Sequence, residues 1–243
     1  MSALASRRFF CAASARMDSS TSPVANWGAI FDWDGVIIDS SWHHEESWER
    51  LARELARPLP PDHFKQGFGR KNEFIVPEIL GWTHEPAEIA RISLRKEELY
   101  REVVAERGID ALPGVRTWLE RLRAAGVPCA IGSSTHRANI ELSLGLIGLG
   151  EFFAHIVSAE DVTRGKPDPQ VFITAAARIG RVAEYCVVFE DAFVGLTAAR
   201  AGRMKCVAVA TTHPPEQLRD AADRVVQRLD ELHAADLAAW FVD

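Results

Sequence analysis

Two aspartates, Asp32 and Asp34, stand at the end of a short apolar run and are followed by Gly35, which lets the chain turn sharply. This pair could serve one phosphate group as a nucleophile and a proton donor. A carboxylate is a weak nucleophile, but an aspartyl-phosphate intermediate divides a hard displacement into two easier ones. We therefore expect Asp32 to attack phosphorus, and Asp34 to protonate the departing alcohol and later deprotonate the attacking water. Alone, such a pair is more often a turn or a calcium loop.

Two further segments offer the donors and the positive charge that this chemistry needs. A carboxylate approaches a phosphate only where cations and hydrogen-bond donors offset the repulsion. In AIGSST, the hydroxyl of Ser133 and the backbone amide of Ser134 can bind phosphoryl oxygens. In RGKPDP, Lys166 can neutralise both Asp32 and the phosphoryl group. The alternative for Ser133 is a hydroxyl that only satisfies the backbone at a strand end.

A fourth segment, VVFED, ends in Glu190 and Asp191. Carboxylates are hard oxygen ligands, and Mg²⁺ suits a site made of carboxylates and phosphate, so we expect Mg²⁺ as the cofactor. The alternative is that both residues only cap the following helix, because carboxylates favour helix N-termini. The fixed order and complementary charges of the four segments make the set much more specific than any one of them.

The elements that must position these residues follow a regular alternation. The apolar run at 27–31 predicts a buried strand that ends at Asp32, and helical patterns such as the one at 114–125 separate it from later runs. Those later apolar runs lie at 127–132, 155–158, 185–189 and 205–210. Alternating strands and helices predict an α/β fold with a Rossmann-like, doubly wound parallel sheet, in which ligands gather beyond the carboxyl ends of the strands. All four segments lie at such ends.

Residues 41–110 break this alternation with mainly helical patterns. We interpret them as an inserted, all-helical cap domain, with the catalytic core formed by residues 27–40 and 111–243. In the cap, His44 shares an apolar helix face with Trp48, and Lys96 interrupts an apolar stripe. Hinges for cap movement are expected near 36–41 and 109–114, where Gly35 and the pair Pro113-Gly114 provide local backbone breaks.

Residues 1–26 form a separate N-terminal extension. They carry Arg7, Arg8 and Arg16 with no acidic residue before Asp18, a pattern similar to an organelle presequence. The favoured interpretation is a disordered extension, or an upstream start with Met17 as the true one, in a cytoplasmic protein. Import into an organelle is the less favoured alternative.

Composition narrows the classes of partner. The chain of 243 residues has 28 basic and 34 acidic side chains without a basic stripe, so we do not expect nucleic acid as a partner. No apolar run approaches the roughly 20 residues needed to cross a bilayer, so we expect no membrane partner. The four cysteines lack metal-ligand spacing and are interpreted as inert thiols in a reducing compartment. The expected partner is a small phosphorylated substrate, bound by a monomer or a weak homodimer.

With these four segments, the chain resembles the haloacid dehalogenase superfamily over roughly residues 27–230, and in particular its phosphatase branch with a helical cap. The resemblance implies Asp32 as nucleophile, Asp34 as acid and base, Ser133 and Lys166 as phosphate-binding residues, Asp191 as metal ligand and Glu190 in a supporting role. It also implies that Mg²⁺ is held by the carboxylate of Asp32 and the backbone carbonyl of Asp34. Family dehalogenases lack an acid at the position of Asp34, because a halide leaves without a proton. The chain is therefore expected to cleave phosphate esters.

The cap resembles that of beta-phosphoglucomutase and related sugar-phosphate phosphatases. The resemblance implies that His44 couples cap closure to proton transfer, that Arg70 grips a second phosphate, and that Arg95 and Lys96 face the substrate. For each of these residues an ordinary structural role remains open: a half-buried histidine, a solvated loop charge, or a lysine that extends from an apolar helix face to water. The substrate-binding set is thus Ser134, His44, Arg70 and Lys96.

One departure from the mutase pattern bears on the reaction. The mutase has a lysine immediately before the glycine that corresponds to Gly67, whereas this chain has Gln66, and Lys65 is one residue too early. A mutase must protect its phosphoenzyme from water, whereas a phosphatase needs only to admit water. We therefore favour a Mg²⁺-dependent phosphatase of sugar phosphates or similar metabolites over a phosphosugar mutase. A catalytically inactive binding module is the remote alternative.

Overall fold

The computed structural model describes residues 25–67 and 70–242, and a six-stranded parallel sheet forms its centre. The strand order is β3-β2-β1-β4-β5-β6, and every neighbouring pair is parallel. The strands are β1 (Gly28–Phe31), β2 (Cys129–Gly132), β3 (His155–Val157), β4 (Cys186–Glu190), β5 (Lys205–Val209) and β6 (Arg224–Val226). The first five match the predicted apolar runs, and the Rossmann-like fold class is confirmed. The sequence reasoning missed β6, a three-residue edge strand of which two residues are only partly buried.

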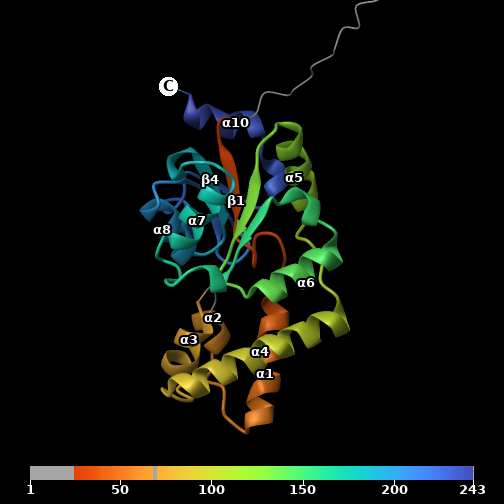
Figure 1. The fold of residues 1–243 in the computed structure, drawn as a ribbon, viewed down its shortest axis with the longest axis vertical. Helices are drawn as coiled ribbons and strands as arrows, with labels where there is room; N and C mark the ends of the chain where they lie inside the picture. The colour runs from red at the N-terminus through yellow and green to blue at the C-terminus, as the bar shows by residue number, and fades with distance from the viewer. Residues whose placement is uncertain (1–24, 68–69, 243) are drawn as a thin grey trace, which may run out of the picture.

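Helices cover both faces of this sheet (Figure 1). They are α5 (Val115–Ala124), α6 (Arg137–Ile147), α7 (Gln170–Arg178), α8 (Phe193–Ala201), α9 (Pro215–Leu218) and α10 (Ala234–Ala238). Successive residues of a strand point to opposite faces. Phe31 accordingly packs in one hydrophobic cluster with residues of α5, α6 and α10, whereas Ile30 packs in a second cluster with residues of α7, α8 and α9.

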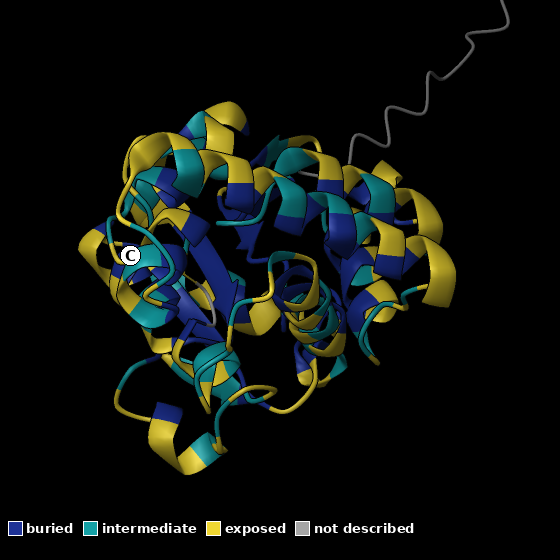
Figure 2. Ribbon diagram, turned by 90° about the horizontal axis from the view of Figure 1, so that it is seen from below, coloured by how far each residue is buried: buried dark blue, intermediate teal, exposed yellow. Residues whose placement is uncertain are grey.

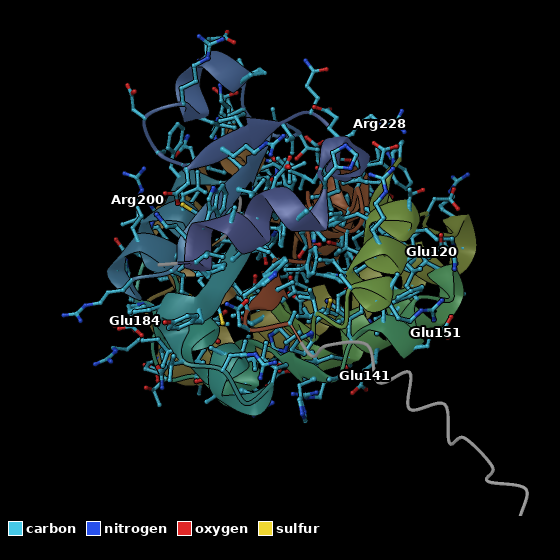
Figure 3. All side chains as sticks on the ribbon, turned by 90° about the horizontal axis from the view of Figure 1, so that it is seen from above. Glu120, Glu141, Glu151, Glu184, Arg200 and Arg228 are labelled. Carbon is cyan, nitrogen blue, oxygen red and sulfur yellow. The ribbon has the colours of Figure 1, made fainter. Side chains whose placement is uncertain are left out.

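The polar and charged residues lie mainly outside these layers. Figure 2 shows buried strands enclosed by helices whose outward-facing residues are exposed. Viewed from the opposite end in Figure 3, the labelled side chains, among them Glu120, Glu141 and Arg228, project from the periphery of the molecule.

A helical cap is inserted between β1 and β2 and lies beyond one end of the sheet (Figure 1). It consists of α1 (Ser41–Leu55), α2 (His63–Gly67), α3 (Asn72–Phe74), a π-helix (Ile75–Ile79) and α4 (Pro86–Arg107). It has its own hydrophobic cluster, in which Trp48 and Leu51 of α1 pack with Ile92 and Leu99 of α4. The periodic apolar faces predicted for these two helices therefore form the centre of the cap.

The two connections between cap and core lie side by side. Ile38 forms an antiparallel bridge with Ala111, and the backbone amide of Leu112 donates a hydrogen bond of 2.9 Å to the carbonyl of Ile37. Gly35 and Gly114 flank these segments with φ angles of 76° and 90°, a region that glycine adopts without steric cost. Both segments fall within the predicted hinge regions, and their hinge role stays a prediction.

The expectations for the N-terminal extension and for the cysteines can be followed only in part. Most of the N-terminal extension, residues 1–24 with Cys11, lies outside the described residues, as do Phe68 and Gly69. In the described part of the chain, the other three cysteines are free and buried, as expected for inert core thiols. Among the described residues, no helix combines the length and the apolar character needed to span a bilayer.

Candidate active site

The carboxyl ends of β1, β2 and β4 place the predicted catalytic residues at one edge of the sheet. Phe31 pairs with Ile131 on one side and with Phe189 on the other, so the residues that follow these three positions meet at the same level. A cavity of about 840 Å³, open to solvent, lies there between core and cap. Nine of the ten predicted site residues line it: Asp32, Asp34, His44, Arg70, Lys96, Ser133, Ser134, Lys166 and Asp191. The tenth, Glu190, is fully buried next to Lys166.

Lys166 joins two of the buried carboxylates. Its ammonium nitrogen lies 2.9 Å from Oδ1 of Asp32 and donates a hydrogen bond of 2.7 Å to Oε1 of Glu190. The other oxygen of Glu190 accepts a hydrogen bond of 2.6 Å from the backbone amide of Ala192. Glu190 therefore holds Lys166 against Asp32 instead of facing the cavity itself.

Asp32, Glu190 and Asp191 form a cluster of negative charge. One carboxylate oxygen from each lies within 4.8 Å of the others. Burial raises the pKa of Asp32 to about 7; Lys166 opposes this rise, and the charge of Glu190 adds to it. Burial and then Glu190 also hold the pKa of Asp191 well above its ordinary value. Oδ1 of Asp191 is buried without a hydrogen-bond partner among the described residues, while Oδ2 accepts a hydrogen bond from Thr212. The three carboxylates thus have a single lysine beside them, and one of their oxygens has no hydrogen-bond partner. Such a set of oxygen donors could hold a divalent cation.

Asp34 has a different environment, which favours its ionised form. Its two oxygens accept hydrogen bonds from the hydroxyls of Ser40 and Thr135, and Oδ1 lies 3.4 Å from Nε2 of His44. Burial raises the pKa of Asp34, but the contacts with His44, Ser40 and Thr135 together outweigh burial and lower the pKa to about 2. The negative charge of a bound phosphate would act in the opposite direction and favour the protonated acid.

His44 is fixed in orientation by two residues of α4. The ammonium of Lys96 can only donate, so Nδ1 of His44 accepts its hydrogen bond of 2.6 Å and the proton lies on Nε2, which faces Asp34. The ring of Tyr100 stacks on the imidazole with a centroid distance of 4.2 Å. Burial, followed by the charge of Lys96, lowers the pKa of His44. A neutral His44 that donates from Nε2 to Asp34 is consistent with the predicted coupling between cap and proton transfer.

The remaining predicted residues differ in how they face the cavity. Ser133 is buried, and its hydroxyl accepts a hydrogen bond of 3.2 Å from the amide of Thr135. Arg70 is exposed on the cap side, with its guanidinium 4.5 Å from the ring centre of Phe74. Lys96, at 2% exposure, already contacts His44 and lies 3.2 Å from Glu97. Its predicted contact with the substrate stays a prediction.

The expectation that Arg95 faces the substrate is wrong. Its guanidinium pairs with the carboxylates of Glu54, Glu98 and Glu102 at 2.8 to 3.0 Å, and these acids belong to α1 and α4. Each of the three glutamates is more than 40% exposed. Adjacent residues on a helix point in directions about 100° apart, so Lys96 enters the cavity while Arg95 turns to the surface.

Sequence reasoning missed several polar residues of the site. A signal existed for Thr135, two residues after Ser133, and for Thr212, which follows the carboxyl end of β5. No local pattern pointed to Glu97 or Asn139, which are buried and hydrogen-bonded to each other across 42 residues of sequence.

Comparison with known proteins agrees with this geometry. Residues 28–203 match the family model for haloacid dehalogenase-like hydrolases. A chloroplastic 5-amino-6-(5-phospho-D-ribitylamino)uracil phosphatase from Arabidopsis thaliana is 41% identical over 86% of this chain, which spans 56% of that relative's length. A validoxylamine A 7'-phosphate phosphatase from Streptomyces hygroscopicus is 31% identical and is covered to 94%, with 84% of this chain aligned. The crystal structure of beta-phosphoglucomutase from Clostridium difficile has a similar fold, with a TM-score of 0.77 and 23% identity over 88% of this chain and 96% of that one.

Proposed function

The chain belongs to the haloacid dehalogenase-like hydrolases, and we propose that it is a Mg²⁺-dependent phosphatase of small phosphorylated metabolites that works through a phosphoaspartate on Asp32. One observation carries the proposal. Asp32 lies in the cavity between Lys166 and Asp191, and Asp34 lies two residues further on with a hydrogen-bonded carboxylate of its own. This arrangement separates the nucleophile from the acid and base.

In the first step, the substrate phosphate binds to the hydroxyl of Ser133, the amide of Ser134 and the ammonium of Lys166. A carboxylate oxygen of Asp32 attacks phosphorus, and the bond from phosphorus to the ester oxygen breaks. The carboxylates of Asp32 and Asp191, with the backbone carbonyl of Asp34, would hold Mg²⁺, which when bound offsets the negative charge of carboxylates and phosphoryl oxygens. Lys166 keeps Asp32 in place during the attack.

Asp34 moves the proton in both halves of the reaction. In its protonated form it gives the proton to the departing alkoxide and becomes a carboxylate. That carboxylate then takes a proton from the water that attacks the phosphorus of the phosphoaspartate, and phosphate leaves as Asp32 is regenerated. The hydrogen bonds from Ser40 and Thr135 and the adjacent His44 stabilise the carboxylate between the two steps.

We infer that the substrates carry a phosphate on a polyol or sugar-like group with a further ring or polar group attached. The cavity extends from Asp32 into the cap, where Trp48, His63 and Phe64 line it together with the polar side chain of Asn72. The two relatives are named for phosphatases of a phosphorylated ribitylaminouracil and of validoxylamine A 7'-phosphate. A phosphorylated ribitylamino-pyrimidine is therefore the first compound to assay.

A phosphosugar mutase is the alternative reaction, supported by the resemblance of the cap and the turn that begins at Gly67. Against it, neither Lys65 nor Gln66 lines the cavity among the described residues. Lys71, which follows Arg70, does line the cavity, but its ammonium donates hydrogen bonds to the backbone carbonyls of Ala159 and Val162.

Replacement of Asp32 by Asn tests the proposed function. We expect Asp32→Asn to abolish phosphate release while its circular dichroism spectrum and melting temperature stay close to those of the wild type, because only the nucleophile is lost. Chelation of Mg²⁺ should have the same effect, reversed when the ion is restored. Undiminished turnover by Asp32→Asn would contradict the assignment. With beta-glucose 1-phosphate and a trace of bisphosphate, glucose 6-phosphate in excess over free phosphate would instead identify a mutase.

We further propose a test of whether residues 1–26 direct the protein into an organelle. The segment carries three arginines before its first acidic residue, Asp18, a pattern typical of import sequences. The Arabidopsis relative is named as chloroplastic. A fluorescent protein fused to residues 1–26 should enter an organelle if the segment is a presequence. Diffuse cytoplasmic fluorescence would instead support a cytoplasmic protein.

A further inference from the structure

A buried amide of the core is clamped by two charged residues of the cap. Asn139 is fully buried in the first turn of α6, directly after the loop that carries Ser133 and Thr135. Its Nδ2 donates a hydrogen bond to Oε2 of Glu97, and its Oδ1 accepts one of 2.9 Å from Arg101. Glu97 and Arg101 are four residues apart on α4 and therefore face the same side of that helix. Figure 1 shows α6 next to α4 where core and cap meet.

The same glutamate is connected to the proton-transfer residue. Oε1 of Glu97 accepts hydrogen bonds of 2.7 Å from Asn72 and 3.2 Å from Lys96. Lys96 donates to Nδ1 of His44, and Nε2 of His44 faces Asp34. The contacts thus run from Asn139 in the core, through three cap side chains, and back to Asp34 in the core.

We propose that Glu97 and Arg101, clamped on Asn139, form an interdomain latch that holds the cap closed and thereby sets the position of His44 against Asp34. This inference rests on the proposed function, in which Asp34 transfers the proton. Glu97, Arg101 and Asn139 are positioning residues, because they act on the reaction through Lys96 and His44.

The chemistry of the latch makes it reversible. In the closed state Glu97 is 4% exposed and has amide and ammonium partners for both of its oxygens. When the cap moves away, water can replace the amide of Asn139 on Glu97 and Arg101. A charged group that exchanges protein donors for water gains little net free energy from either state, which suits a contact that opens and closes in each catalytic cycle.

Swapping the carboxylate of residue 97 with the amide of residue 139 tests the latch. In Asn139→Asp, two carboxylates face each other, so we expect the cap to dock poorly and kcat on an alkyl phosphate to fall by about thirtyfold, within the range that small misplacements of catalytic groups cause. In Glu97→Gln, the charge that holds Lys96 is lost, and a fall of about tenfold is expected on the same grounds. In the double variant, the amide of residue 97 can donate to the new carboxylate at 139 while its oxygen still accepts from Asn72 and Lys96. The double variant should recover to within about fivefold of the wild type, a non-additivity typical of residues in direct contact.

A matched control and a second readout separate a latch from a purely structural contact. Glu98, the neighbour of Glu97 on α4, pairs with Arg95 on the surface, so Glu98→Gln should behave as the wild type. Amide hydrogen exchange in α6 and in the middle of α4, measured with Mg²⁺ and beryllium fluoride, should be faster in Asn139→Asp and slow again in the double variant. Melting temperatures report whether each variant folds. If Asn139→Asp proves unfolded, amide hydrogen exchange in Glu97→Gln decides the question alone: faster exchange in α6 and in the middle of α4 than in the wild type supports the latch, and unchanged exchange overturns it.

The outcomes are unambiguous. A double variant no better than the poorer single variant, or wild-type kcat and exchange in Asn139→Asp, overturns the latch. These exchange measurements do not depend on turnover. If Asp32→Asn retained activity while the exchange pattern followed the expectation, the proposed chemistry would fall and the docking contact would stand.

Discussion

The active-site cavity has a buried lysine on each side, and the two lysines have different surroundings. In the core, Lys166 lies between Asp32 and Glu190, with Asp191 also within the cluster, so three carboxylates share one ammonium. In the cap, Lys96 has one carboxylate beside it, that of Glu97.

This difference shows which of the two sites still needs a ligand. The core cluster keeps an unpaired buried oxygen on Asp191, whereas both oxygens of Glu97 have hydrogen-bond partners. An unpaired buried oxygen in an acidic cluster is costly unless a cation binds it, whereas a fully paired cluster is stable as it stands. The core cluster therefore resembles a ligand-binding site, whereas the Glu97 cluster already has its partners and forms the docking contact between cap and core.

The largest effect that follows from this comparison is expected for Lys166→Met. Without the ammonium, the charges of Asp32, Glu190 and the incoming phosphate are no longer offset, and we expect kcat/KM to fall by more than about a thousandfold. Breaking a buried pair should also cost about 3 kcal/mol of unfolding free energy, less when Mg²⁺ is present because a bound cation stabilises the folded state. Phosphate release and urea unfolding with and without Mg²⁺ measure both effects. A Lys96→Met variant that lost as much activity would contradict the comparison.

A smaller effect, confined to the core cluster, is expected for Gly195→Ala. A Cβ atom at Gly195 would lie 1.6 Å from Oε1 of Glu190, so that carboxylate must leave its place between Lys166 and the amide of Ala192. We expect kcat/KM to fall by about a hundredfold, comparable to the loss of one stabilising donor at an active site.

Gly145 provides the matched control for this substitution. It also lies in a helix, α6, but apart from its two chain neighbours and the nearby backbone of that helix, no described heavy atom lies within 4 Å of the Cβ position. Gly145→Ala should leave activity unchanged and stabilise the protein by about 0.5 to 1 kcal/mol, because alanine is the better helix former. Equal activity losses in the two variants would show that the effect does not pass through Glu190.

The same comparison explains how much the sequence could predict. In the core, strand register brings together the residues that follow Phe31, Gly132 and Phe189, so apolar runs and the residues after them were enough to predict the acidic cluster with Ser133. Lys166 lies outside the strands and was predicted from its charge in the segment RGKPDP. Resemblance to a known family added the expected metal contacts of Asp32 and Asp34 and the supporting role of Glu190. The edge strand β6 was missed because three residues with partial burial leave no apolar run.

The cap could be predicted only in part, because its side chains find partners by packing of distant segments. Helical periodicity placed His44 and Lys96 on inward faces, and both line the cavity. It could not reveal that Glu97 binds Asn139, since that contact depends on how α4 docks on α6. It also could not separate the neighbours Arg95 and Lys96, whose different surroundings depend on which face of α4 meets the core.

The smallest effect is expected for Arg70→Ala, on the exposed side of the cap. Because Arg70 is solvated, its attraction for a second anionic group of a substrate is screened and amounts to about 1 kcal/mol or less. We therefore expect KM to rise by about three- to fivefold for bisphosphates or other substrates with a second anion, with kcat unchanged. For p-nitrophenyl phosphate, which has no second anion, KM should stay the same. An equal rise for both substrates would mean that Arg70 supports the cap by contact with Phe74 instead of binding the substrate. Arg70 would then belong with the cap residues whose charged groups already have protein partners, in contrast to the core cluster that needs a ligand.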